Sequence, residues 1–279
     1  MPDAVRPTVL ILGGFLTAPP VYRPLTRRLL ARGAAGVVVA NVWTPDWLIA
    51  SWRGTAAIAT RSGVALRRAI EVSRACSGGA PVLIVGHSAG GITARLLTAP
   101  EPFPGRRFGA TAHVGAIVSL GTPHRLAAGA GIGRRLNEVA AEIAAEHVPG
   151  AFFAPRISYV SVASSAVVAG RRSGRGRLAT LMYEFVIGRA AVPGTEGDGV
   201  VPVAATRLDG ARHVLLERAL HSPTAGGAWY GSDEEVDEWW PIALEAWREA
   251  LAARASGAPD APETTAAAPN GLAARTATV

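Results

Sequence analysis

Length, composition and charge already exclude several classes of protein. The 279 residues are 49% hydrophobic, which suits one large or two small domains with a sizeable core, and a single cysteine excludes an internal disulfide. No apolar run reaches the ~18 residues of a membrane helix, and no basic region precedes the apolar stretch near the N-terminus, so we expect a cytoplasmic protein. The net charge of +7 comes from arginines spread along the chain without interleaved aromatics, and no Cys/His cluster has zinc spacing. We therefore expect no nucleic-acid partner, no metal and no other cofactor.

Apolar runs alternate with helix-like stretches along the chain. Such alternation is typical of an α/β protein with a mostly parallel central sheet flanked by helices. In the first helix, we expect Leu25, Leu29 and Leu30 to lie on one face. The predicted strands are 9–12, 37–40, 82–85, 116–120, 157–163 and 214–216, and the predicted helices are 20–32, 55–75, 91–97, a stretch around 133–147, and 232–253.

Residues 164–197 have a composition unlike their surroundings. A short apolar stretch at 166–169 is followed by a dense Gly/Arg run at 171–177. We predict that 164–197 is an insertion that can form a lid. A basic, mobile lid can meet an anionic lipid surface, so a weak contact with such a membrane surface is expected.

The C-terminal region divides into a helix and a tail. In helix 232–253, Ser232 and Glu235 have the spacing of a capping box, and three tryptophans are expected to pack on the sheet. Residues 255–279 are rich in Ala, Pro and Thr with few large apolar groups, which predicts a disordered tail. One domain is therefore predicted, over residues 1–254.

A Gly-x-Ser-x-Gly pattern follows the predicted strand 82–85. Gly86, Ser88 and Gly90 indicate a nucleophile elbow, a tight strand-to-helix turn that exposes a serine hydroxyl at the carboxyl edge of a sheet. A side chain at position 86 or 90 would collide with the turn or the adjacent backbone, which explains both glycines. The turn also places Ser88 at a helix N-terminus, where free N–H groups favour developing negative charge. Ser88 is the predicted nucleophile.

A serine hydroxyl needs a base, and the base needs an acid that orients it. In this architecture the acid and then the histidine follow the serine along the chain. Asp198 is the favoured acid, because a carboxylate between glycines and ahead of Val-Val-Pro is typical of a loop held by its backbone. Asp209, which fits a simple turn, and Glu196, on the same loop as Asp198, are the alternatives.

Six histidines compete for the role of the base. His221 is favoured because it follows the last predicted strand, where the base of such a triad belongs. His124 is the alternative, since it follows strand 116–120 at the same sheet edge, although no acid is placed to orient it. His87 lies beside Ser88 on a turn that should direct its side chain away.

Backbone N–H groups and aromatic side chains complete the predicted site. The oxyanion is expected to be held by the N–H of Ala89, directly after the nucleophile, and by that of Phe15 in the Gly-Gly-Phe loop after the first strand, with Gly14 as the alternative to Phe15. Trp43 and Trp47 follow the second strand and are candidates to line an acyl pocket; aromatic packing beneath a loop is the other interpretation.

Taken together, these motifs resemble the lipase/esterase-like members of the α/β-hydrolase superfamily. The resemblance covers nearly the whole chain up to about residue 254, although Leu12 stands where many lipases have a histidine. It implies the α/β-hydrolase fold and the order of the triad, and it does not name a substrate. The segments that carry it are 12–15, 86–91, 119–124, 197–202 and 229–233.

The sequence therefore predicts a serine hydrolase that cleaves carboxylic esters, lipid-like or of medium or short acyl chain, through an acyl-enzyme. An acyltransferase or thioesterase that uses the same triad is one alternative, because all three share the acyl-enzyme. A catalytically inactive binding or scaffold member of the fold is the other.

Overall fold

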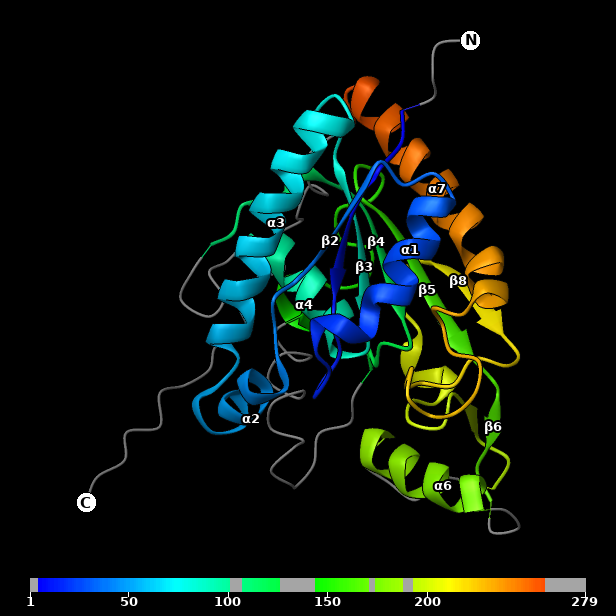
Figure 1. Ribbon diagram of the computed structural model, residues 1–279. Coiled ribbons are helices and arrows are strands. Elements are labelled where there is room, and N and C mark those ends of the chain that lie inside the picture. Colours follow the sequence, from blue (N-terminus) through cyan, green and yellow to red (C-terminus); the bar gives the residue numbers. More distant parts are fainter. Residues whose placement is uncertain (1–4, 101–106, 126–143, 171–173, 188–192, 259–279) are drawn as a thin grey trace, which may run out of the picture.

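The computed structural model describes residues 5–100, 107–125, 144–170, 174–187 and 193–258, and its centre is a parallel sheet of six strands in the order β2-β1-β3-β4-β5-β8 (Figure 1). Every residue of β1, β3 and β4 is buried, as expected for parallel strands covered on both faces. The predicted α/β fold with a mostly parallel sheet is confirmed. The strands are β1 (Thr8–Leu12), β2 (Gly36–Val39), β3 (Val82–His87), β4 (Val114–Leu120), β5 (Ser158–Ser164) and β8 (Arg212–Leu216).

Helices cover both faces of this sheet, and the alternation of side chains along each strand divides the core between them. Val9 and Ile11 pack with one pair of helices, whereas Leu10 and Leu12 pack on the opposite face. The first pair is α1 (Arg23–Ala31) and α7 (Asp233–Ala255), and the second is α3 (Ala56–Cys76) and α4 (Ala89–Thr98), with α2 (Thr44–Arg53) at the end of α3 (Figure 1).

The start of the first predicted helix differs from expectation. Residues Pro19–Tyr22 form a 3-10 turn, η1, and α1 begins only at Arg23. Leu25 and Leu29 are buried, but Leu30 is 45% exposed, so the prediction that the three leucines lie on one face is wrong. Leu30 follows Leu29 by one residue, about 100° around a helix, which turns it off the buried face.

Helix α7 packs on the sheet through its tryptophans, as predicted. Trp239 and Trp247 are fully buried, and Trp247 Nε1–H donates a hydrogen bond to Pro81 O at 2.8 Å. The predicted capping box is wrong, because the hydroxyl of the N-cap Ser232 accepts the N–H of Trp229 at 3.0 Å and makes no cap bond. The short turn before the helix thus uses the oxygen that a capping box requires.

The segment 164–197 holds a short antiparallel pair and a helix. Strand β6 (Val167–Val168) pairs with β7 (Glu196–Gly197), and α6 (Gly174–Ile187) lies between them in sequence, beyond the carboxyl end of β5 (Figure 1). Most of the predicted helix around 133–147, and the tail from 259, lie outside the described residues. Among the helices that are described, none combines the length and apolar character needed to span a bilayer.

Candidate active site

The register of the sheet aligns the ends of its central strands. Gly86 of β3 pairs with Leu12 of β1 on one side and with Ser119 of β4 on the other. The loops that follow β1, β3 and β4 therefore leave the sheet side by side at its carboxyl edge, where ligands bind in open α/β sheets. Ser88 and the Gly-Gly-Phe loop are both in this position.

Ser88 adopts the strained backbone that an elbow requires. Its φ of 53° and ψ of −125° lie in a region that residues other than glycine rarely occupy, at a cost of about 1–3 kcal/mol. A Cβ at position 86 would come within 2.5 Å of Gly91 Cα, and one at position 90 would clash with the carbonyl oxygen of Leu12. The steric reason predicted for both glycines is confirmed.

Neighbouring loops hold the Ser88 backbone in this conformation. Its N–H donates to Leu120 O at 2.9 Å, and the hydroxyl of Thr122 donates to Ser88 O at 2.8 Å. Both partners come from the end of β4 or from the loop that follows it. The elbow is thus anchored on the next strand of the sheet as well as by its own turn.

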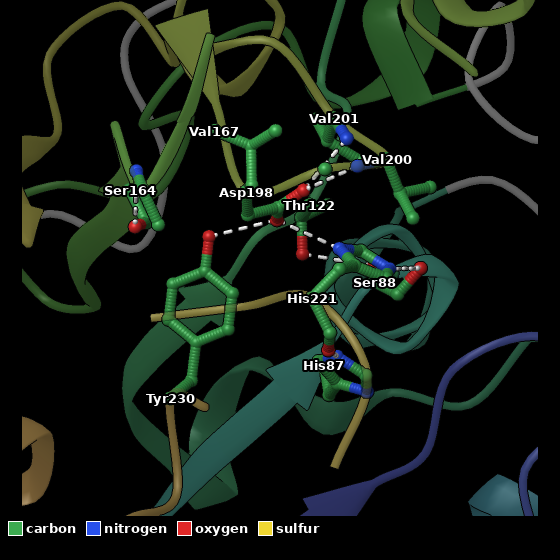
Figure 2. A network of polar contacts seen from close by, with 12 residues as sticks. His87, Ser88, Thr122, Ser164, Val167, Asp198, Val200, Val201, His221 and Tyr230 are labelled. Atoms are coloured by element: carbon green, nitrogen blue, oxygen red, sulfur yellow. Dashed lines mark hydrogen bonds and ion pairs between the residues drawn. The ribbon is translucent and has the colours of Figure 1, made fainter. Parts of the chain in front are cut away.

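The structure brings Ser88, His221 and Asp198 into one hydrogen-bonded row (Figure 2). His221 Nε2 lies 3.0 Å from Ser88 Oγ, and His221 Nδ1 lies 2.7 Å from Asp198 Oδ2. An ionised carboxylate only accepts hydrogen bonds, so Nδ1 carries the proton and Nε2 is free to accept that of the serine. The acid and the base come from loops 110 and 133 positions after the serine.

The carboxylate of Asp198 is buried, and both of its oxygens accept hydrogen bonds from protein groups. Its Oδ1 accepts the backbone N–H of Val200 at 2.9 Å and of Val201 at 2.7 Å, and its Oδ2 accepts the hydroxyl of Tyr230 at 2.8 Å besides His221. Burial by itself would raise the pKa of this carboxyl, but His221 and the two backbone N–H groups outweigh it and hold the pKa below the usual value. Asp198 therefore stays ionised at neutral pH.

The loop after β1 packs directly on the serine. A Cβ at position 14 would lie 2.8 Å from Ser88 Cβ, so only glycine allows this approach. The Gly14 N–H donates to Tyr22 Oη at 2.9 Å and is thereby occupied. Of the two N–H groups considered in this loop, that of Phe15 has no such partner among the described residues. Ala89 begins α4, where first-turn N–H groups lack partners within the helix.

The two candidate tryptophans occupy different environments. Trp47 is 4% exposed, and its ring meets that of Phe15 edge-on with centroids 5.6 Å apart. Trp43 is 43% exposed, and its indole N–H donates to Asn41 Oδ1 at 2.6 Å. Trp47 thus packs behind the loop that carries Phe15, while Trp43 is partly exposed to solvent.

The alternative acids and bases lie away from the row. Asp209 is at the surface, where it forms an ion pair with Arg125 at 2.6 Å, and Glu196 is exposed. His124 is buried, with Nδ1 3.2 Å from Arg95 Nη1. Burial and the charges of Arg95 and His213 lower the pKa of His124 well below its usual value, so this imidazole stays neutral.

Sequence reasoning missed three side chains that support the site: Tyr230, Thr122 and His87. Tyr230 bonds to Asp198 and Thr122 to Ser88, as given above, and His87 Nε2 lies 2.9 Å from the His221 carbonyl oxygen (Figure 2). His87 was expected on the turn, but it is the last residue of β3, and its buried ring contacts the His221 loop. A histidine between a buried strand and the serine of a Gly-x-Ser-x-Gly pattern was the available signal.

Comparison with known proteins gives the fold a name. No protein-family model matches the chain, and no curated protein matches it in sequence. Among solved structures, the mature form of the lipase BlEst2 from Bacillus licheniformis is similar, with a TM-score of 0.56 and 13% identity over 88% of this chain and 94% of that one. The propeptide form of the same lipase has a TM-score of 0.52 and 15% identity over 88% of this chain and 51% of that one. The chain therefore has the α/β-hydrolase fold, as the sequence motifs predicted.

Proposed function

We propose that this α/β-hydrolase-fold protein is a serine hydrolase that cleaves carboxylic esters. The observation that carries the proposal is the row Ser88–His221–Asp198, with 3.0 Å and 2.7 Å between the interacting atoms. A hydroxyl within hydrogen-bond reach of an oriented, unprotonated imidazole nitrogen is the arrangement that activates serine for acyl transfer.

Acylation follows from this geometry. Ser88 Oγ attacks the ester carbonyl carbon while His221 Nε2 takes the hydroxyl proton. The new C–O bond converts the carbonyl oxygen into an oxyanion. As that intermediate collapses, the bond to the leaving alcohol breaks, and His221 returns its proton to the alcohol oxygen. An acyl group then remains on Ser88 as an ester.

Deacylation repeats these steps with water. His221 Nε2 takes a proton from a water molecule, whose oxygen attacks the acyl carbon, and the proton then returns to Ser88 Oγ as the acid departs. Asp198 keeps the proton of His221 on Nδ1 throughout and stabilises the imidazolium that forms twice in each cycle. Its four hydrogen bonds support this constant role.

The N–H groups of Ala89 and Phe15 are the proposed oxyanion donors. The N–H of Ala89 begins helix α4 beside the nucleophile, and the Phe15 loop is held against Ser88 by the close contact at Gly14. The occupied N–H of Gly14 favours Phe15 over Gly14. Loss of one such donor typically raises the barrier by about 3 kcal/mol.

Substitution of the nucleophile tests the proposal. We expect Ser88→Ala to abolish hydrolysis of a short p-nitrophenyl ester and covalent labelling by a fluorophosphonate, with an unchanged circular dichroism spectrum. Ser73→Ala is the matched control, since it also removes one hydroxyl, from α3, where Ser73 Oγ donates to Ala80 O. Turnover that persists in Ser88→Ala would refute the assignment.

The same experiment separates the alternatives. A wild-type protein that hydrolyses no ester and does not react with the fluorophosphonate would favour the inactive scaffold. Faster release of p-nitrophenol on addition of a small alcohol, with formation of the new ester, would favour an acyltransferase. A preference for thioesters over matched oxygen esters would favour a thioesterase.

Exposed apolar side chains near the sheet's carboxyl edge support an apolar acyl group. Trp43, Leu48 and Ile49 on or beside α2 are 43–54% exposed, and α2 is joined to the Phe15 loop by the hydrogen bond from Thr44 Oγ1 to Leu16 O at 3.1 Å. We infer that Trp43 contacts the acyl chain and that Trp47 supports the Phe15 loop by packing against the Phe15 ring. A series of p-nitrophenyl esters of increasing chain length tests this inference: Trp43→Ala should raise KM progressively as the chain lengthens, and an equal effect on all lengths would contradict it.

Helix α6 supports the proposed lid and the weak contact with an anionic lipid surface. Leu178, Leu181 and Phe185 recur on one helix face and are 58%, 60% and 42% exposed, and Arg175 and Arg177 are exposed at its start. Vesicles with and without anionic phospholipid provide the test. We expect binding only to anionic vesicles and faster turnover of aggregated than of dissolved esters, both reduced in Leu178→Ser/Leu181→Ser. Equal rates on aggregated and dissolved esters would contradict the proposed lid.

A further inference from the structure

A buried chain of polar groups joins the loop after β1 to the loop that carries His221. The Gly14 N–H donates to Tyr22 Oη at 2.9 Å, Tyr22 Oη lies 2.9 Å from His87 Nδ1, and His87 Nε2 lies 2.9 Å from His221 O. Tyr22 is 1% exposed and His87 is 2% exposed. The steps bridge separations of 8, 65 and 134 residues.

The chemistry of the groups fixes the direction of each bond. A carbonyl oxygen only accepts, so His87 donates from Nε2 to His221 O. Burial, with the nearby charge of His221, lowers the pKa of His87 to about 3, so the ring is neutral and its Nδ1 accepts. The proton for that bond comes from Tyr22, whose single hydroxyl proton is shared between His87 Nδ1 and Thr17 Oγ1, 3.1 Å away, because Thr17 Oγ1 donates its own proton to Gly14 O.

The chain reaches His221 at its peptide group rather than at its ring. His221 N–H donates to Asp198 O at 3.0 Å, while His221 O accepts the proton of His87 Nε2. Both polar groups of the backbone at this residue are therefore held, in addition to the two ring nitrogens. Small movements of this backbone would move Nε2 relative to Ser88 Oγ.

We propose that His87 and Tyr22 are positioning residues that lock the loop carrying the Phe15 N–H and the loop carrying His221 to each other. The inference rests on the proposed function, because it gives the two loops the roles of oxyanion donor and base. Each loop is then aligned on the other as well as on Ser88. Since misplacement of a reacting group by about 1 Å can cost about 100-fold in rate, the coupling should be visible in turnover.

Two substitutions of His87 separate the two halves of the chain. In His87→Gln, the amide N–H can reach the position of Nε2 and keep the bond to His221 O. In His87→Asn, the amide is shorter and can meet Tyr22 but not His221 O. The two variants have the same chemical group, and each keeps one bond of the chain and loses the other, so both break the connection between the loops.

A third variant and a matched control complete the set. Tyr22→Phe removes the hydroxyl that serves both Gly14 and His87. Tyr159→Phe is the control: Tyr159 is 4% exposed, burial raises its pKa to about 12 as it does for Tyr22, and its hydroxyl accepts the Phe153 N–H at 3.4 Å, outside this chain. A purely structural effect of a lost buried hydroxyl would appear in both tyrosine variants.

The measurements are kcat and KM for a short p-nitrophenyl ester, with thermal unfolding of each variant. We expect kcat to fall about 10- to 100-fold in His87→Gln, His87→Asn and Tyr22→Phe with KM nearly unchanged, because each of these variants breaks the connection between the two loops, and kcat to be unaffected in Tyr159→Phe. In the wild type, the 15N shifts of His87 should indicate an Nε2–H ring that does not titrate between pH 5 and pH 8.

The possible failures are distinguishable. A wild-type protein that neither cleaves esters nor reacts with a fluorophosphonate would overturn the proposed function and this inference with it. An active wild type would overturn the inference alone if kcat were intact in His87→Gln, His87→Asn or Tyr22→Phe, or if His87 carried its proton on Nδ1.

Discussion

The buried neutral His87 predicts a specific dependence of stability on pH. In the unfolded chain its imidazole has the ordinary pKa of 6.5, whereas burial lowers the pKa in the folded protein to about 3. Between these values the unfolded chain binds a proton that the folded chain does not. The free energy of unfolding must therefore fall as the pH falls below 6.5.

The size of this effect follows from the two pKa values. Each pH unit in the window is worth about 1.36 kcal/mol, and pH 5 lies about 1.5 units below the unfolded pKa, so His87 removes about 2 kcal/mol between pH 7 and pH 5. That loss is a sizeable part of the roughly 5–15 kcal/mol by which a typical domain is stable.

Urea denaturation of the wild type and of His87→Gln isolates the contribution. Asp198, whose pKa is lowered, and His124 titrate in both proteins, so their effects cancel in the difference between the two. Tryptophan fluorescence can follow unfolding, since the chain has seven tryptophans. We expect the free energy of unfolding of the wild type, relative to that of the variant, to fall by about 2 kcal/mol from pH 7 to pH 5. Parallel pH profiles would mean that His87 protonates in the folded state as easily as in the unfolded state, and would refute the reasoning.

Three further substitutions probe the elbow, the acid and the core. Gly90→Ala should destabilise the protein by about 3 kcal/mol or more in urea denaturation, because its methyl group would clash with the Leu12 carbonyl; a wild-type urea midpoint would show that this turn can relax. Tyr230→Phe should lower kcat/KM for a p-nitrophenyl ester about tenfold, since it removes a charge-assisted hydrogen bond of Asp198, and an unchanged value would show that the other three bonds suffice. Trp247→Ala should cost about 3–5 kcal/mol of stability through the cavity it leaves. The kcat per active site, with the sites counted by fluorophosphonate titration, should stay at the wild-type value. A lower kcat per site would link this packing to the active site.

Local patterns determine much of this fold. Uninterrupted apolar runs such as 82–85 predict strands buried on both faces, and the structure places them at the centre of a parallel sheet. The glycines around Ser88 predict a turn in which no side chain fits, and both are packed against backbone. In each case the constraint acts within a few residues, so it is visible in sequence.

The sequence-based predictions were wrong at Ser232 and Leu30, where the local pattern allows more than one hydrogen bond or contact for the side chain. Ser232 has the spacing of a capping box, but its hydroxyl instead accepts the N–H of Trp229. Leu30 fits an apolar helix face by spacing, yet it falls beyond the contact with the sheet. A pattern specifies which bonds or contacts are available, and packing against distant elements selects among them.

The sequence by itself determined the strand–turn–helix around Ser88 and an acid and a histidine in the expected order after it. Only the tertiary structure decided that Ser88, Asp198 and His221 lie within hydrogen-bond reach of one another, and that His87 faces the main chain of His221. Asp198 and His221 are 23 residues apart in sequence, and the other two contacts join residues 133 and 134 positions apart. The distances between these side chains depend on the register of the strands from which their loops leave the sheet. The residues next to each side chain in sequence do not determine that register, because it is set by the packing of the whole sheet.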